Sequence, residues 1–260
     1  MSTQAEPVSR SHRVRVISGY VGGVALGVIV WQVIGMNSSS EVFVSLTATL
    51  QRLGQLISAG TLGSALAASF ESYAVGMVIA LVVGGFLGLL LARRPLLRVA
   101  FGPWVIALYA TPMVGLIPFL LALLGFGFWA KVVVIIAFAV FPVLLNTQRG
   151  AQSIAPELLD VARCYRSSER DVWWHVIIPF TLPFLMTGVR QSLARGLVGM
   201  IAGDFFLSSD GLGSLLITAS QRFDTAEILA ITLTITIIGL VLMAIGRAAE
   251  KHFARWRVGQ

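Results

Sequence analysis

The chain has 260 residues, of which 57% are hydrophobic and 12% are charged, and its mean hydropathy is +0.86. Soluble domains carry about 25% charged residues, so this composition excludes an ordinary soluble domain and predicts a membrane protein. The formal net charge of +7 does not indicate nucleic-acid binding, because in so apolar a chain the placement of the basic residues matters more than their sum.

Six apolar segments approach or exceed the ~20 residues that a helix needs to cross a bilayer core. They are residues 16–34, 73–92, 99–124, 132–145, 177–201 and 228–245. The first follows three arginines like a signal peptide, but its length and the lack of a small-residue cleavage site favour a retained helix. We therefore predict an all-α polytopic bundle of about six transmembrane helices, with a polar tail over residues 1–15 and a transmembrane domain over residues 16–260.

Basic residues gather in alternate connecting segments. One set of segments holds Arg10, Arg13, Arg15, Arg93, Arg94, Arg98, Arg149, Arg163, Arg166, Arg170, Arg247, Lys251, Arg255 and Arg257. The other set holds Arg52, Lys131 and Arg222. The positive-inside rule then predicts that both termini and the polar segment 149–178 are cytoplasmic.

Apolar residues spaced by three to four in segment 37–63 predict an amphipathic helix on the outer side.

Glycine and proline mark the second to fourth spans. Gly84 and Gly88 form a small-xxx-small pair, which indicates close helix packing. Pro112 and Pro118 interrupt the third span as candidates to line a translocation pathway, although kinks of purely structural origin fit the same pattern.

Residues 149–178 predict two short helices joined by an elbow. Pro156 and Glu157 are typical of a helix start, and Leu158, Val161, Ala162 and Tyr165 then fall on one face. Ser167 or Ser168 can cap a second helix, whose first turn holds the acids Glu169 and Asp171. Such an elbow suits a groove in another protein, or rests at the lipid headgroups through Trp173 and Trp174. Both interpretations remain open at this point.

Three charged residues occupy the fifth span or its outer end. Charges within a membrane are expensive and default to functional hypotheses. Arg195, near the centre, is a candidate pore-facing cation that favours an anionic solute. Arg190 lies closer to the cytoplasmic side, and Asp204 either pairs with an arginine or contacts a docked protein. An internal structural ion pair explains these charges equally well.

Several function classes lack their signatures. The three histidines are scattered, no metal-binding pattern occurs, and no phosphate loop of the Gly-x-x-x-x-Gly-Lys-Ser/Thr type is present. The sequence therefore predicts no catalytic residue, metal or cofactor on this chain. An ion-coupled secondary transporter would show inverted repeats and intramembrane acids, and neither stands out.

The polar segment also carries a spaced motif. Asp160-Val161-Ala162, then Arg166, then Val176-x-Ile178-Pro179 resembles the EAA loop of binding-protein-dependent ABC importer permeases, whose pattern is Glu-Ala-Ala, Gly and Ile-x-Leu-Pro. The further segments 141–147, 156–159, 179–183, 188–190 and 208–213 resemble the nitrate, sulfonate, taurine and bicarbonate branch. The resemblance covers nearly the whole chain from about Thr61 onward.

This resemblance implies a type I permease fold whose loop docks on cytoplasmic ATPases that carry ATP and Mg²⁺. The residues it assigns to coupling are Pro156, Glu157, Asp160, Val161, Ala162, Arg163, Tyr165, Arg166 and Pro179. It places an outer gate at Ser208, Gly211 and Gly213. It further implies an external solute-binding protein, a second permease copy or close paralogue, the bacterial inner membrane, and a small anion as solute. The alternative solute is a neutral heterocycle, a thiamine-precursor pyrimidine or riboflavin.

Two residues depart from the family pattern. Asp160 replaces the usual Glu and keeps the charge on a shorter stem. Arg166 replaces the Gly that would allow a left-handed backbone at the helix end. Arg166 at positive φ would carry about 1 kcal/mol of strain; otherwise the elbow adopts another geometry. We expect Arg166 to be a surface cation beside the ATPase.

Overall fold

The computed structural model describes residues 10–39, 43–207 and 210–253, and every regular element in these ranges is a helix. The helices are α1 (Arg10–Asn37), α2 (Leu46–Ser58), α3 (Thr61–Arg93), α4 (Pro95–Ala110), α5 (Met113–Leu124), α6 (Phe128–Gln152), α7 (Pro156–Cys164), α8 (Glu169–Val172), the π-helix η1 (Trp173–Ile177), α9 (Ile178–Leu207), α10 (Leu212–Gln221) and α11 (Thr225–Phe253). The predicted all-α class is confirmed.

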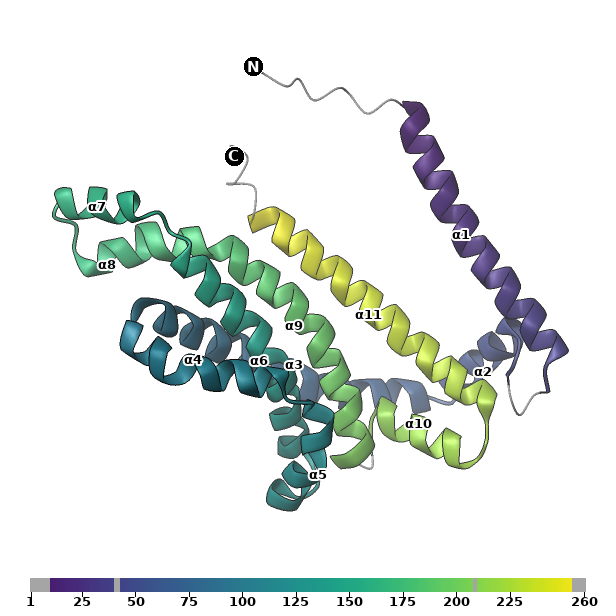
Figure 1. Ribbon diagram of the computed structural model, residues 1–260. Helices are drawn as coiled ribbons and strands as arrows, with labels where there is room; N and C mark the ends of the chain where they lie inside the picture. Colours follow the sequence, from purple (N-terminus) through teal and green to yellow (C-terminus); the bar gives the residue numbers. More distant parts are fainter. Residues whose placement is uncertain (1–9, 40–42, 208–209, 254–260) are drawn as a thin grey trace.

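Helix α6 forms the centre of the bundle because it packs against both α3 and α9 (Figure 1). Glycines bring the backbones of α3 and α6 close together. A Cβ atom at Gly84 would lie 2.7 Å from the carbonyl oxygen of Val140, and one at Gly88 would lie 2.6 Å from that of Leu144. The close packing predicted from these two glycines is therefore present.

Replacing Gly88 with alanine is expected to destabilise the bundle by about 1–3 kcal/mol, because the new methyl group must push α6 away. Thermal unfolding of the purified protein should show a lower Tm. The matched control is Gly54→Ala in α2, where no atom lies within 4 Å of the added methyl group. A Gly88→Ala variant as stable as the Gly54→Ala variant would contradict this account of the contact.

The third predicted span differs from expectation. A single kinked helix over residues 99–124 is wrong, because the chain forms α4 and α5, which meet at an angle of 99°. The break falls at Thr111 and Pro112. Thr111 is extended, with φ −67° and ψ 134°, since a following proline disfavours the helical conformation of the residue before it. Pro103 and Pro118, by contrast, lie inside α4 and α5.

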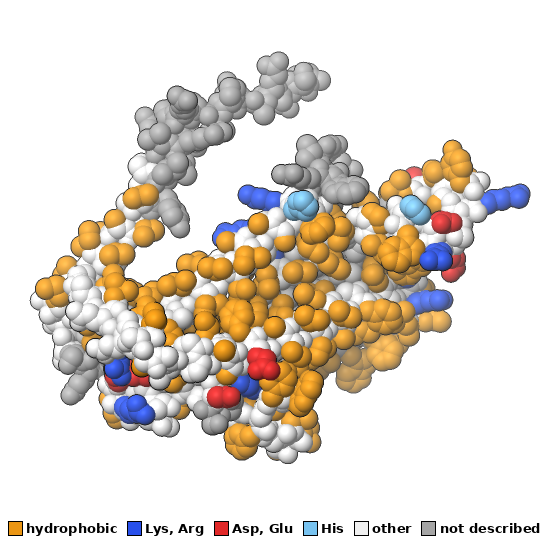
Figure 2. Space-filling model, turned by 180° about the vertical axis from the view of Figure 1, so that it is seen from behind, with side chains coloured by type: hydrophobic (Ala, Val, Ile, Leu, Met, Phe, Trp, Pro, Cys, Tyr) orange, Lys and Arg blue, Asp and Glu red, His pale blue; other side chains and the backbone are white. Residues whose placement is uncertain are grey.

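Four continuous helical segments are long and apolar enough to cross a membrane: α3, α6, Glu169–Leu207 and α11. The bent pair α4 and α5 makes a fifth if it counts as one span. Helix α1 covers the first predicted span, but its apolar stretch Val21–Asn37 is shorter than the other four. Hydrophobic side chains cover most of the middle of the face in Figure 2, while charged ones lie toward its margins.

The loops sort to two ends of the bundle. Helices α7 and α8 project at one end, and α2 and α10 lie at the other (Figure 1). The predicted amphipathic helix is α2, which buries Thr49 and Leu56 and exposes Leu50 and Ile57. Helix α1 leaves the bundle and contacts α2 at its far end.

Candidate functional site

Local capping signals position the two short helices of the polar segment. Helix α7 begins with Pro156 at its first position, and α8 follows the cap Ser168. The Ser168 hydroxyl oxygen accepts from the Asp171 N–H at 3.2 Å and donates to its carboxylate at 2.5 Å. The predicted pair of helices and the Ser168 cap are confirmed.

The elbow between them is a Schellman turn with arginine at the left-handed position. Arg166 has a φ of +50°. The Ser167 N–H donates to the Ala162 carbonyl at 3.0 Å, and the Arg166 N–H donates to the Arg163 carbonyl at 2.9 Å. These are the two bonds that define this helix ending. Arg166 thus keeps the geometry that glycine usually supplies, and it is exposed.

An Arg166→Gly variant is expected to gain about 0.5–1 kcal/mol of stability, because glycine adopts positive φ without a Cβ clash. Thermal unfolding should show a Tm higher by roughly 2 °C. Arg170→Gly, at an exposed helical position of α8, is the control and should lower the Tm, because glycine is a poor helix former. If both variants lost stability equally, the strain at Arg166 would be disproved.

Helix α7 contacts the bundle through one side only. Ala162 is buried, and Leu159 packs against the buried cluster of Ala151, Ile154 and Ile177. The guanidinium of Arg93, at the end of α3, lies 5.9 Å from the ring centroid of Trp173 and fixes the next turn. The loop is therefore attached to the bundle through Ala162, Leu159 and Trp173.

The adjoining face of α7 leaves large apolar side chains uncovered. Leu158, Val161 and Tyr165 are 46%, 54% and 82% exposed, and we call these three residues the elbow surface. The predicted face of Leu158, Val161, Ala162 and Tyr165 is present, because these positions are spaced by three or four residues on a helix. Of the four residues, only Ala162 is buried.

Charged residues surround the elbow surface. Arg163 pairs with Asp160 at 3.1 Å, and both side chains are largely exposed. Glu157 is also exposed, as is Pro179 in the first turn of α9. The predicted coupling residues from Pro156 to Arg166 therefore lie on one projecting loop, where exposed apolar side chains have charged neighbours. Pro179 lies apart from them, at the start of α9.

The five-residue π-helix η1 joins α8 to α9. Its Ile178 N–H donates to the Trp173 carbonyl, five residues earlier. This π-helix could not be predicted from the sequence, since no local signal distinguishes a π-turn from an α-helical turn. Trp173 is half-buried, whereas Trp174 is 61% exposed.

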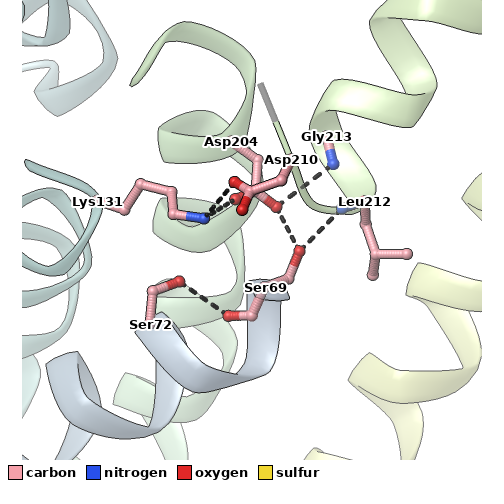
Figure 3. Close-up of polar contacts among 7 residues, drawn as sticks. All are labelled: Ser69, Ser72, Lys131, Asp204, Asp210, Leu212 and Gly213. Carbon is pink, nitrogen blue, oxygen red and sulfur yellow. Dashed lines mark hydrogen bonds and ion pairs between the residues drawn. The ribbon is translucent and has the colours of Figure 1, made fainter. Parts of the chain in front are cut away.

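A second polar group lies at the opposite end of the bundle (Figure 3). Asp204 is fully buried and lies 3.3 Å from the Lys131 ammonium, itself 3% exposed; Lys131 also lies 3.3 Å from Asp210. The Ser69 hydroxyl donates to Asp204 at 2.5 Å and accepts from the Leu212 N–H at 2.8 Å. We call Ser69, Lys131, Asp204 and Asp210 the Lys131 cluster.

The Lys131 cluster fastens the turn before α10 to α3, α6 and α9. The Gly213 N–H donates to Asp204 at 3.4 Å, and Gly211 has a φ of +104°, which favours glycine. A Cβ atom at Gly213 would lie 2.6 Å from that of Asp204. Ser208, the third predicted gate residue, lies outside the described residues.

The sequence left Asp204 either beside an arginine, against a docked protein or in an internal ion pair. The structure shows an internal ion pair, with Lys131 rather than an arginine as the partner. Lys131 and Ser69 were missed as members of a site. Lys131 seemed to belong to a loop, but α6 begins at Phe128 and carries it inside the helix. The position of Lys131 directly before an apolar run was the one signal that could have indicated a lysine inside a helix of the bundle.

The two arginines of α9 have different surroundings. Arg190 forms an ion pair with Glu250 of α11 at 2.6 Å, and Thr187 donates to the same carboxylate at 2.7 Å. Arg195 is exposed, and its guanidinium lies 4.8 Å from the ring centroid of Tyr109. Pro112 lines a small cavity with Arg195, whereas Pro118 lies exposed inside α5 and outside that cavity.

Several membrane-length helices, together with a two-helix projection at one end, define a polytopic membrane protein of the permease class. The chain belongs to the family of binding-protein-dependent transport system inner membrane components, whose profile matches residues 84–258. It is therefore a permease subunit of an ABC importer. The function predicted from the motif-bearing loop is confirmed.

Named relatives and a solved structure agree with this assignment. The nitrate import permease NrtB of Synechocystis sp. is 27% identical over 249 residues, which cover 91% of this chain and 88% of NrtB. The formylaminopyrimidine transport permease ThiX of Halalkalibacterium halodurans is 24% identical over 195 residues, covering 75% of this chain and 78% of ThiX. An inward-facing structure of the MetNI methionine ABC transporter matches with a TM-score of 0.63 at 18% identity, over 72% of this chain and 94% of that one. The type I permease fold is confirmed.

Proposed function

We propose that two copies of this permease, or one copy and a close paralogue, form a translocation pathway driven by two cytoplasmic ATPase subunits. The elbow surface docks in a groove of each ATPase. When the ATPase subunits close on ATP and Mg²⁺, they pull the two elbows together. The pathway then changes from inward-open to outward-open. An external binding protein delivers the solute, and hydrolysis takes place on the partner subunits rather than on this chain.

The exposed elbow surface is the observation that carries this proposal. Three large apolar side chains on a solvent-exposed loop would bury favourable area against a partner at about 25 cal/mol per Å². The loop is anchored through Ala162 and Leu159, so a force on the elbow reaches α6 and α9 without being lost in a flexible segment. An interfacial role for the loop is less favoured, because Tyr165 is the most exposed of the three and projects at the elbow tip.

The charge distribution supports a cytoplasmic elbow. Arg93 and Arg94 at the end of α3 line one cavity with Arg163 of the elbow, so basic segments distant in sequence gather at one end. By the positive-inside rule, this gathering of arginines supports a position for this end on the cytoplasmic side of the membrane. The Lys131 cluster then lies on the outer side, where the binding protein docks.

A small anion is the favoured solute. Arg195 is a cation within a membrane-length helix, and the relative NrtB is named for nitrate import. The relative ThiX, named for formylaminopyrimidine transport, supports the alternative, a neutral heterocycle such as a thiamine-precursor pyrimidine or riboflavin.

Reconstitution tests the coupling. The permease is placed in lipid vesicles with its ATPase subunits and its solute-binding protein. ATP hydrolysis should rise several-fold when solute-loaded binding protein is added, and should not rise with empty binding protein. Hydrolysis that ignores the loaded binding protein would overturn the proposal. A thermal-shift screen of the binding protein against nitrate, bicarbonate, sulfonates, formylaminopyrimidine and riboflavin decides between the solute classes.

A further inference from the structure

Arg195 differs from the other cations inside the helical bundle. Lys131 and Arg190 each have a carboxylate partner at 3.3 Å or less. Arg195, in the middle of α9, has no carboxylate within 4.0 Å among the residues that the structure describes, and its guanidinium contacts the ring of Tyr109 instead. An arginine facing lipid tails in this position would be costly. This face of α9 must therefore turn to water or to another chain.

One neighbouring position on the same face of α9 is also polar. Gln191 lies one turn before Arg195 on the same face and is exposed. Its side-chain oxygen accepts from the amide of Asn146 on α6 at 3.2 Å. Gln191 and Arg195 thus place two polar side chains, one turn apart, on the same exposed face of α9.

A cavity of about 200 Å³ opens directly beside the guanidinium. It is lined by Tyr109, Thr111, Pro112, Met113, Ala137, Phe138, Phe141 and Arg195. The cavity exists because the chain breaks between α4 and α5, which leaves the 99° corner unfilled.

The chemistry of the walls selects for negative charge. A guanidinium offers five N–H donors in a planar fork, which matches the oxygens of a sulfonate, nitrate or bicarbonate group. The Tyr109 ring holds the guanidinium by a cation–π contact, and Tyr109 is itself packed against Phe141 at 6.0 Å between centroids. Apolar walls around the cation strengthen its attraction for an anion, because they keep the local dielectric constant low.

We propose that this cavity binds the oxyanion group of the solute in transit, with Arg195 as the residue that contacts it and Tyr109 as the residue that positions Arg195. The inference rests on the proposed function, and it adds a selectivity site within the membrane to the one on the binding protein. A neutral heterocycle would gain nothing from Arg195, so the site also discriminates between the two solute classes.

A thiol-protection measurement tests the site without requiring ATP coupling. Cys164 is the only cysteine of the chain, so Cys164→Ser gives a background in which Ala137→Cys places a single thiol on the cavity wall. The rate of its modification by neutral N-ethylmaleimide is measured in the full permease complex. Ethanesulfonate or nitrate should slow the reaction at least fivefold. Ethyl methyl sulfone, a neutral analogue of ethanesulfonate, should not.

Arg195 variants decide whether the cation is responsible. Arg195→Gln should remove the protection, and Arg195→Lys should retain part of it. Equal protection by the sulfone and the sulfonate, or protection that survives Arg195→Gln, would overturn the inference. Absence of protection by both anions in the Arg195 protein would also overturn it.

Uptake separates this inference from the proposed function. In vesicles that contain the complete transporter, Arg195→Gln should lower ATP-dependent uptake of the bound anion at least tenfold relative to the unmodified protein. If uptake by Arg195→Gln equals that of the unmodified protein, the site is wrong and the importer assignment stands. If the unmodified protein shows no ATP-dependent uptake of any screened solute, the proposed function fails, and the protection measurement still decides the site.

Discussion

A glutamate in place of Val161 is expected to abolish ATP-driven transport while leaving the fold intact. Val161 lies in the middle of the elbow surface and is 54% exposed, so the substitution changes the stability of the isolated permease by no more than about 0.5 kcal/mol. In the assembled transporter the new carboxylate would enter an apolar groove, where an unpaired charge costs several kcal/mol. We therefore expect uptake to fall at least 100-fold.

The measurement pairs uptake in vesicles with recovery of the ATPase on the purified permease. Val161→Glu should lose both, whereas the Tm of the permease alone should stay the same. Gln152→Glu adds the same charge at an exposed position just before the elbow and should leave uptake unchanged. Asp160→Lys, which reverses a charge beside the elbow surface, should weaken coupling as well. Normal transport by both Val161→Glu and Asp160→Lys would rule out docking through this surface.

Replacing Lys131 with methionine is expected to cause the largest loss of stability. The substitution leaves the fully buried carboxylate of Asp204 without its cation, and breaking a buried ion pair in this way costs about 3–5 kcal/mol. The Tm should fall on the order of 10 °C. The turn before α10 should also loosen, because Asp204 accepts the bonds from Ser69 and Gly213.

A second substitution separates the charge from the packing. Lys131→Met combined with Asp204→Asn should recover most of the lost stability, because the amide oxygen can still accept from Ser69 and no charge is buried. Arg222→Met, which removes an exposed cation near the same end, should have no effect on the Tm. A double variant as unstable as Lys131→Met alone would show that the contact acts through shape rather than charge.

Local signals in the sequence were sufficient to predict the elbow. Pro156 favours a helix start through its fixed φ, and Ser168 caps the next helix through a bond to Asp171, three positions away. Such signals can be read without knowing the fold. The left-handed geometry at Arg166 followed from the family pattern, in which glycine stands there.

Contacts between distant segments were not predictable. Both Leu158 and Leu159 are apolar, so periodicity alone could not show that Leu159 faces the bundle and Leu158 faces solvent. The partnership of Lys131 with Asp204 joins two helices far apart in sequence. Proline predicted a kink in the third span, but the 99° angle depends on how α5 packs against α6 and α9.

The π-helix η1 fixes the rotational phase between the elbow and α9. Each residue turns an α-helix by about 100°, and a π-turn holds one residue more than an α-turn in its hydrogen-bonded ring. Shortening Trp173–Ile177 by one residue would therefore rotate the elbow surface about a quarter turn away from its present direction. Arg195 would keep its place beside Tyr109. The length of this segment is therefore constrained. Insertions or deletions here should be selected against even at positions where substitutions are tolerated.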